Sequence, residues 1–359
     1  MNSRDRFITT INGGEPDRPP VFANFTPQVA EKMSKHLGLP YEEPLDSMLS
    51  TRISHTDLLL HLGNDAVGTA SIAPHNAPTV NNADGTMTNE YGMVFKPMGL
   101  YNEFYKFPLD YADSEADIDN YKFPDPFAKG RYDDTDYKIS KFKKNYGVIG
   151  DLETAIFETS WYYTGLEKFF MDMMLQPPYF YKLLDKIMDI HLEMGKEMIR
   201  KGVDMLWAGD DFGGQDGMLI DPVQWRDIFK PRMKYMFEEF RKVNPDIKIA
   251  WHTCGSVVPI IPDLIEIGLD ILNPLQPMAK DMTPEFLKSE FGKDLMFFGG
   301  ICVQDLMPNG TPQQIKDEVK RRVEILGKGG GYILAPAHNI QDDTSIENIT
   351  AFFEAVHEL

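Results

Sequence analysis

The sequence predicts an α/β protein, a (β/α)8 TIM barrel with a long insertion in an early βα loop. Short runs rich in β-branched and aliphatic residues alternate with helical patterns from residue 146 onward, which is typical of parallel βα units. Two further runs near the N-terminus bring the strand count to the eight of a closed barrel. An open doubly wound sheet shows the same local alternation, so the strand count is what favours the barrel.

The expected strands are short apolar runs bounded by turn residues. Each is long enough to cross a barrel wall, and each of the last six is followed by a helical pattern or a polar loop. In chain order they span residues 20–23, 65–67, 146–150, 203–207, 247–251, 269–272, 295–298 and 332–334.

The helices between these runs carry start signals. Residues 178–200 place apolar side chains at helical spacing, which predicts a long helix packed against the barrel. Thr311 is followed three residues later by Gln314, the pattern of a capping box. Thr344 and Glu347 have the same spacing and predict a second capping box.

Residues 75–145 interrupt the alternation. They are rich in Pro, Asn, Asp and Tyr and contain a hairpin-like run at 92–97. A segment of this length and polarity predicts an insertion within one domain of residues 1–359, not a separate domain. It is a candidate lid for the barrel mouth.

The composition limits the classes of partner and compartment. A net charge of -19 argues against nucleic acid, because binding to phosphates needs a surplus of Lys and Arg. The N-terminus lacks the apolar segment of a secretory signal, and no run is long enough to span a membrane. We therefore expect a cytoplasmic protein, in which the two cysteines are free thiols and not a disulfide.

Polar residues follow the expected strands in unusual number. Active sites of (β/α)8 barrels lie at the C-terminal ends of the strands, so these positions are the first candidates for function. They hold Asp151, Glu153, Asp210, Asp211, Gln215, His252, Cys254, Asn273, Gln276, Cys302, Asp305, His338 and Asn339.

A metal site is the sharpest hypothesis from this set. His252 and Cys254 lie two residues apart at a strand end, so both side chains point to the same face. Thiolate and imidazole are ligands that zinc prefers, and a catalytic zinc needs only three protein ligands. His338 is the expected third ligand, with Cys302 and Asp211 as alternatives. By itself, a lone cysteine such as Cys302 is more often a packing residue.

The acidic stretch at residues 209–217 has two interpretations, a site for a hard cation or a tight loop. It lacks the spacing of a calcium loop, and its glycines and acids also fit a tight βα loop. We expect at least one of Asp210 and Asp211 to face the site, where a carboxylate could hold a cationic group or act as acid or base.

Several segments together resemble the uroporphyrinogen decarboxylase superfamily. They are residues 4–21, Gly209-Asp-Asp, His252-Thr-Cys-Gly255, Phe298-Gly-Gly-Ile301, residues 332–340 and Glu347-Asn-Ile349. The resemblance spans nearly the whole chain and implies a (β/α)8 barrel. It also implies one of two chemistries: metal-free decarboxylation of a porphyrinogen, or zinc-dependent methyl transfer involving a corrinoid or a thiol such as coenzyme M.

Departures from the family motifs favour methyl transfer. The arginine-rich motif that binds substrate carboxylates in true decarboxylases is matched here by residues 21–27, which contain no arginine. Their pyrrole-binding aspartate is matched by Ala70-Ser-Ile-Ala73. The methyltransferase branch uses His-x-Cys and a later cysteine, and this chain has His252 and Cys254 but Pro336-Ala-His-Asn339 at the last position. The third ligand is then His338, although a histidine there also resembles the decarboxylases.

The resemblance and the residues together predict a zinc-dependent methyltransferase. It would move a methyl group between a small methylated substrate or thiol and a corrinoid (cobalamin) on a carrier protein. His252, Cys254 and His338 would bind the metal, and these three with Asp211 would be catalytic. The residues expected to bind the substrate are Asp210, Gln215, Tyr163 and Asn273. The alternatives are a uroporphyrinogen decarboxylase-like lyase and a non-enzymatic tetrapyrrole carrier.

Overall fold

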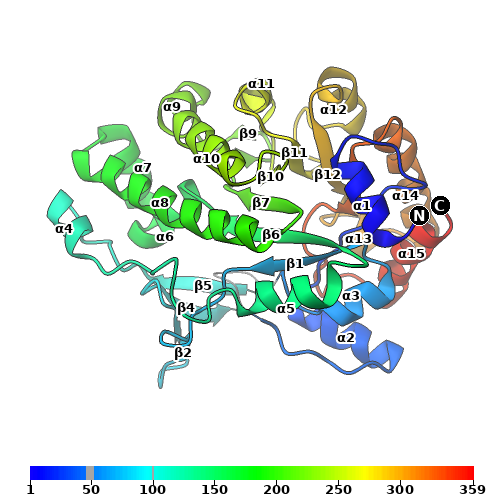
Figure 1. Cartoon of the computed structure of the whole chain (residues 1–359), viewed down its shortest axis with the longest axis horizontal. Coiled ribbons are helices and arrows are strands. Elements are labelled where there is room, and N and C mark those ends of the chain that lie inside the picture. The colour runs from blue at the N-terminus through cyan, green and yellow to red at the C-terminus, as the bar shows by residue number, and fades with distance from the viewer. Residues whose placement is uncertain (46–51, 99–100) are drawn as a thin grey trace.

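A curved parallel sheet, here called the main sheet, forms the centre of the protein. The structure, a computed structural model, describes residues 1–45, 52–98 and 101–359. Within these residues seven parallel strands follow one another in the order β1-β6-β7-β10-β11-β12-β13 (Figure 1). Their bounds are β1 (Ala66–Ala70), β6 (Gly147–Thr154), β7 (Met205–Gly209), β10 (Lys248–His252), β11 (Ile271–Leu275), β12 (Met296–Ile301) and β13 (Tyr332–Pro336).

The first expected strand, residues 20–23, lies beside the main sheet without forming a regular strand. Val21 forms a parallel bridge with Leu334 of β13, and its carbonyl accepts the backbone N–H of Asp65, just before β1, at 2.8 Å. The segment therefore connects the two edges of the sheet. Side chains take two of its donors: the Asp65 carboxylate accepts Val21 N–H and the Asn64 side-chain oxygen accepts Ala23 N–H, while Phe22 N–H donates to the carbonyl of Leu334. Because side chains take these two N–H groups, no regular ladder forms between this segment and β1.

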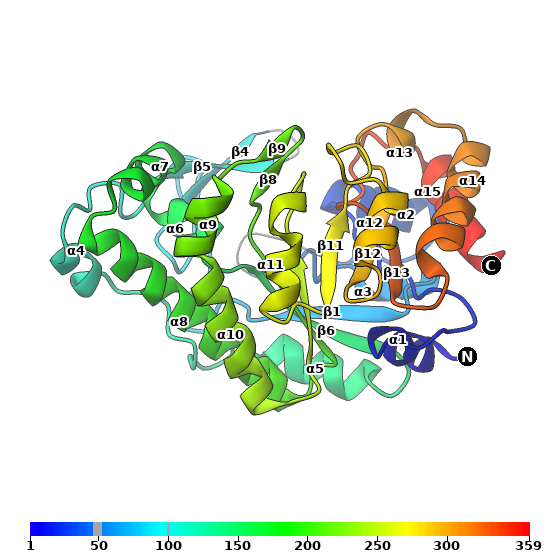
Figure 2. The same cartoon turned by 90° about the horizontal axis from the view of Figure 1, so that it is seen from above.

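The strands surround one apolar interior. Its buried side chains come from every strand of the main sheet, from Phe22 and from helix α1 (Ser3–Ile11). Phe7 and Ile11 of α1 belong to this core, and α1 lies at the end of the main sheet where the strands begin (Figure 2). The filled interior of a barrel leaves the opposite, C-terminal end for the site. The interior residues are Phe7, Ile11, Phe22, Ala66, Ile149, Met205, Trp207, Ala250, Ile271, Phe298, Ile333 and Ala335.

Helices cover the outside of the main sheet. The long helix expected at 178–200 is α8, which ends at Gly202 in the left-handed conformation. The capping box of Thr311 and Gln314 is present at the start of α14. The box expected at Thr344 was wrong: Ser345 caps α15 by accepting the N–H of Asn348, so Glu347 falls one position early.

The helices are α1, α2 (Pro27–Leu37), α3 (Thr56–Leu62), α4 (Glu115–Asn120), α5 (Asp133–Phe142), α6 (Phe157–Thr164), α7 (Leu166–Leu175), α8 (Pro178–Lys201), α9 (Pro222–Ile228), α10 (Lys230–Val243), α11 (Ile261–Glu266), α12 (Pro284–Phe291), α13 (Leu306–Asn309), α14 (Pro312–Arg322) and α15 (Ile346–His357), with short turns η1 (Val258–Ile260) and η2 (Val323–Gly327).

A second, antiparallel sheet follows β1, in the region of the expected insertion. Its strands are β2 (Val80–Asn81), β3 (Met87–Thr88), β4 (Val94–Met98) and β5 (Tyr101–Lys106). Apolar side chains of this region, such as Tyr91 and Phe95, pack with Tyr162 of α6 and Leu183 of α8. Helix α5 belongs to the barrel instead, because Lys138 donates to the carbonyl of Gly68 in β1. Helix α5 thus contacts the main sheet, although it falls within the expected insertion of residues 75–145.

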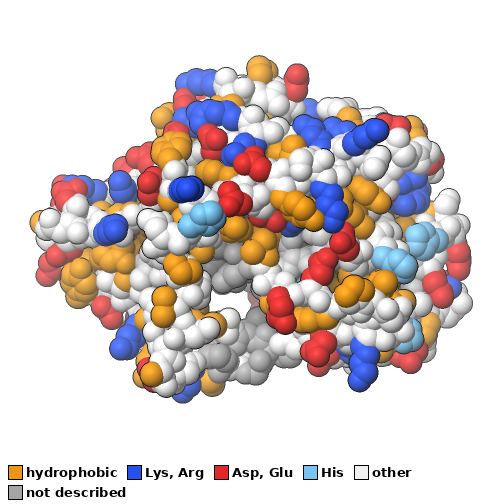
Figure 3. Space-filling model, turned by 60° about the horizontal axis from the view of Figure 1, so that its bottom comes forward, with side chains coloured by type: hydrophobic (Ala, Val, Ile, Leu, Met, Phe, Trp, Pro, Cys, Tyr) orange, Lys and Arg blue, Asp and Glu red, His pale blue; other side chains and the backbone are white. Residues whose placement is uncertain are grey.

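The surface mixes the two signs of charge. On the face drawn in Figure 3, acidic and basic side chains are interspersed with apolar ones, and the face is hollowed near its centre. Among the helices of the described residues, none combines the length and apolarity needed to cross a membrane.

Candidate metal and substrate site

The structure brings His252, Cys254 and His338 together at the C-terminal ends of the strands. His252 is the last residue of β10, Cys254 follows it, and His338 follows β13. One ligand atom from each lies within 4.8 Å of the others. The Cys254 Sγ is 3.4 Å from the His252 Nε2, and the two imidazole rings are 6.0 Å apart between centroids. Curvature of the sheet makes this possible, since β11 and β12 separate β10 from β13.

Asn273 of β11 orients the ring of His252. Its side-chain oxygen lies 2.6 Å from the His252 Nδ1 and accepts the indole N–H of Trp207 at 3.1 Å. The indole can only donate, so this atom of Asn273 is the acceptor and Nδ1 of His252 carries the proton. The Nε2 lone pair then faces Cys254 and His338. Asn273, expected to bind substrate, has its oxygen occupied by these two donors.

The two imidazoles are neutral at pH 7. Burial, followed by the positive charge of Arg52, lowers the pKa of His252 to about 3. Burial and the neighbouring His252 lower the pKa of His338 to about 4. Neutral imidazole is the form that binds a metal ion.

Asp211 lies beside the three candidate ligands. Its Oδ1 accepts the backbone N–H of Cys254 at 2.7 Å and is 3.6 Å from the His252 Nε2. Glu158 lies behind it, accepting the N–H of Asp211 at 3.0 Å and the hydroxyl of Tyr162 at 2.9 Å. Burial raises the pKa of Glu158, and the charge of Asp211 raises it further. The pKa of the Cys254 thiol is also raised, by burial and then by Asp211.

Asp210, in contrast, points away from the candidate ligands. Its fully buried carboxylate accepts the backbone N–H groups of Ala155, Ile156 and Glu158. It therefore fixes the turn that leads from β6 into α6. Burial raises the pKa of Asp210 to about 7, although these N–H donors oppose the shift.

The structure does not bring two other expected substrate residues to this place. Gln215 is exposed in the turn between β8 (Gly213–Gly214) and β9 (Gly217–Met218). Tyr163 is fully buried among Tyr91, Tyr121 and Phe123, and its hydroxyl has no partner among the described residues. Helix α6 directs the side chain of Tyr163 toward the residues of the expected insertion. The position of a residue after a strand does not reveal this orientation.

Cys302 is a buried free cysteine after β12. It is not part of the His252, Cys254 and His338 group, which is the only such group found in the ranges 1–45, 52–98 and 101–359. The buried position of Cys302 fits a packing role, which is the interpretation that the sequence favours for a lone cysteine.

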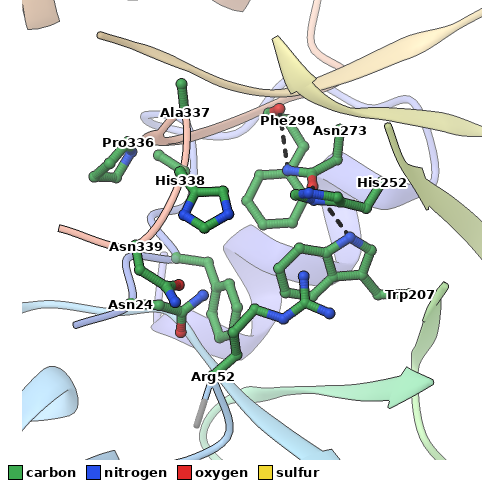
Figure 4. A pocket seen from close by; sticks show the side chains of 12 residues that line it. Asn24, Arg52, Trp207, His252, Asn273, Phe298, Pro336, Ala337, His338 and Asn339 are labelled. Carbon is green, nitrogen blue, oxygen red and sulfur yellow. Dashed lines mark hydrogen bonds between the residues drawn. The ribbon is translucent and has the colours of Figure 1, made fainter. Parts of the chain in front are cut away.

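A pocket opens beside the two imidazoles (Figure 4). Arg52 lies over the indole of Trp207, with the guanidinium carbon 4.2 Å from the ring centroid. Asp151 of β6 holds the guanidinium, accepting from Nε at 3.1 Å and Nη2 at 2.9 Å. The lining residues are Phe22, Asn24, Arg52, Trp207, His252, Asn273, Phe298, Ala335, Pro336, Ala337, His338 and Asn339.

Asn24, Trp207 and Arg52 are among the lining residues that the sequence reasoning did not name as candidates for the site. Asn24 follows the first expected strand, so the strand-end rule applied there would have found it. Trp207 ends the fourth expected strand, where its apolar character indicated core. Arg52 lies in the connection before α3 and carries no motif, so nothing in the sequence marks it.

A family profile for uroporphyrinogen decarboxylase (URO-D) matches residues 107–359. The chain belongs to the uroporphyrinogen decarboxylase family. This family member is 25% identical over 224 residues to a methylated-thiol–coenzyme M methyltransferase of Methanosarcina mazei, which covers 61% of this chain and 56% of the relative. It is 24% identical over 265 residues to a uroporphyrinogen decarboxylase of Psychromonas ingrahamii, covering 68% of this chain and 69% of the relative. The chain thus spans little more than half of the first of these curated relatives.

A solved structure matches over the whole length of this URO-D family member. The methyltransferase from Methanosarcina mazei superposes with a TM-score of 0.69 at 18% identity, covering 100% of this chain and 99% of that chain. At this level of identity the likeness establishes the fold. The TIM-barrel class expected from the strand count is therefore confirmed.

Proposed function

We propose that the protein is a zinc-dependent methyltransferase. It moves a methyl group between a small methylated substrate or thiol and a corrinoid carried by a partner protein. One observation carries the proposal: His252, Cys254 and His338 converge with their ligand atoms within 4.8 Å of one another. Two imidazoles and one thiolate suit zinc, and three protein ligands leave a position for a substrate atom.

The surroundings of the three ligands support a divalent cation. Asp211 and Glu158 stand next to one another on one side of the group. Like charges held close together in a buried site repel, and a bound cation relieves this repulsion. Asn273 adds the hydrogen bond to the second nitrogen of His252 that metal-bound histidines usually have.

Bound zinc would supply Lewis acidity, by lowering the pKa of a thiol or by polarising the bond to the transferred methyl group. The chain's own residues hold the geometry. Asp211 fixes the backbone of Cys254 through its N–H, and Asn273 directs Nε2 of His252 toward the metal position. The pocket beside His252 and His338 is the place where the small substrate would lie.

The choice of chemistry draws support from the relatives. One relative is named a methylated-thiol–coenzyme M methyltransferase, and another a methylcobamide:CoM methyltransferase, 26% identical over 180 residues. Corrinoid-linked methyl transfer is therefore the activity that we propose here. The acceptor of those relatives is not carried over, because the family's later cysteine is His338 in this chain.

A metal assay tests the proposal. Protein purified without added zinc should contain about one equivalent by mass spectrometry of the metal, and Cys254→Ala and His338→Ala should lose most of it. Cys302→Ala is the matched control and should keep its zinc. A zinc content of the wild-type protein below about a tenth of an equivalent, unchanged in Cys254→Ala, would refute the proposal. Methyl transfer to a corrinoid protein, abolished by a chelator, is the second measurement.

The second candidate function is a uroporphyrinogen decarboxylase-like lyase. The match to the Psychromonas ingrahamii decarboxylase, over 69% of that protein, favours it. This alternative expects turnover of a porphyrinogen that survives chelation. Loss of all activity with the chelator, and its return with zinc, would decide against the lyase.

A further inference from the structure

The pocket beside His252 and His338 combines an aromatic box with a resident cation. Trp207 packs against Phe298 at 5.3 Å and Phe22 at 6.1 Å between ring centroids. Aromatic boxes of this kind bind methylammonium groups through the faces of their rings. Here the guanidinium of Arg52 already covers the Trp207 indole at 4.2 Å.

A positively charged substrate is therefore disfavoured. It would have to replace Arg52 on the indole or stand next to a second positive charge. Arg52 is fixed where it is, because Asp151 accepts from two of its nitrogens and is itself 1% exposed. A bidentate arginine–carboxylate pair of this burial resists displacement.

A negatively charged substrate is disfavoured for a different reason. The charge of Arg52 is already paired with Asp151, and the charges of Glu153 and Glu158 act on it as well, so a carboxylate entering the pocket would lose its hydration without gaining a new countercharge. Among the described residues that line the pocket, the other polar groups are the amides of Asn24, Asn273 and Asn339 and the two imidazoles. Those groups suit an uncharged hydroxyl, ether or thioether.

We propose that this pocket selects an uncharged, small methylated substrate, and that Arg52, held by Asp151 over Trp207, is the residue that determines this specificity. The inference rests on the proposed function in one respect: that the substrate carries a methyl group to be transferred. The charge selection itself rests on the contacts of Arg52 with Asp151 and Trp207.

Three probes of similar size and different charge test the proposal. They are 2-(methylthio)ethanol, which is neutral, 2-(methylthio)ethylamine, which is a cation at pH 7, and (methylthio)acetate, which is an anion. Isothermal titration calorimetry would be run on the full chain with and without one equivalent of zinc. We expect the neutral probe to bind at least about tenfold more tightly than either charged probe.

Two variants should gain affinity, which a merely structural role cannot explain. Asp151→Asn removes the carboxylate that accepts from two nitrogens of Arg52 and should raise the affinity for (methylthio)acetate at least about tenfold. The double variant Arg52→Gln with Asp151→Asn removes both buried charges together and uncovers the indole. It should raise the affinity for 2-(methylthio)ethylamine by a similar factor.

The matched control is the pair Arg131 and Glu90, an equally buried bidentate contact outside the pocket. Arg131→Gln with Glu90→Gln should leave the order of the three probes unchanged. The inference is overturned if wild-type protein binds a charged probe as tightly as the neutral one, if no probe binds, or if neither variant gains affinity. Zinc content and methyl transfer are measured separately, so failure of the proposed function is distinguishable from failure of the charge selection.

Discussion

The orientation of His252 by Asn273 leads to a prediction that separates metal binding from stability. In Asn273→Ala, the N–H of Trp207 and the Nδ1 of His252 both lose their acceptor in a buried place. Each unsatisfied donor costs about 1–3 kcal/mol, so the free energy of unfolding should fall by about 2–6 kcal/mol. Zinc affinity should fall about 10- to 100-fold, because His252 loses the contact that fixes its ring and proton.

Two further variants make this prediction specific. Asn273→Asp keeps an oxygen for both donors and should restore most of the zinc affinity. Asn348→Ala is the control: this buried side chain donates to the carbonyls of Met307 and Gly310, and none of these three residues lines the pocket. Its loss should reduce stability without changing zinc affinity. Zinc affinity would be measured by competition with a chromophoric chelator, and stability by urea unfolding.

The reasoning fails if Asn273→Ala loses stability as expected but binds zinc within about twofold of wild type. Such a result would mean that His252 keeps its orientation without the amide. It would also fail if Asn348→Ala weakened zinc binding as much as Asn273→Ala does, because the effect would then be general loosening of the fold.

Three other predictions concern single residues. Burial lowers the pKa of His191 to about 4 from its ordinary 6.5. The unfolded chain therefore binds the extra proton first as the pH falls, and unfolding free energy should drop by on the order of 3 kcal/mol from pH 6.5 to 4. Urea titrations should show this pH slope reduced in His191→Gln; equal slopes in both proteins refute it. Asp210→Ala should lower the free energy of unfolding by on the order of 3 kcal/mol, since three N–H groups lose a charged acceptor. The exposed Asp216→Ala serves as control, and equal midpoints would contradict the assignment. Gly255→Ala should displace the backbone next to Cys254 and reduce zinc content, because φ is +76° and a Cβ would lie 2.5 Å from Gly213. Gly85→Ala, with φ +81° and open space, tests backbone strain alone; similar zinc loss in both variants would refute the steric argument.

The strand-end rule located the neighbourhood of the site, but not the role of each residue in it. Asp210 and Asp211 are adjacent, yet one fixes the turn into α6 and the other contacts Cys254. Tyr163 lies on the side of α6 that packs against the insertion. Which way such side chains point depends on the packing of neighbouring elements, and the local sequence pattern does not contain this information.

The sequence by itself determined seven of the eight strand runs, the starts of α8 and α14, and the pairing of His252 with Cys254, because hydrophobic periodicity and an i, i+2 spacing are local properties. Only the tertiary structure decided that His338 meets them, since curvature of the main sheet must bring the ends of β10 and β13 together. It also brought Arg52 over Trp207 and against Asp151. That contact joins residues far apart in the chain, and no local pattern marks it because it exists only once the barrel has closed.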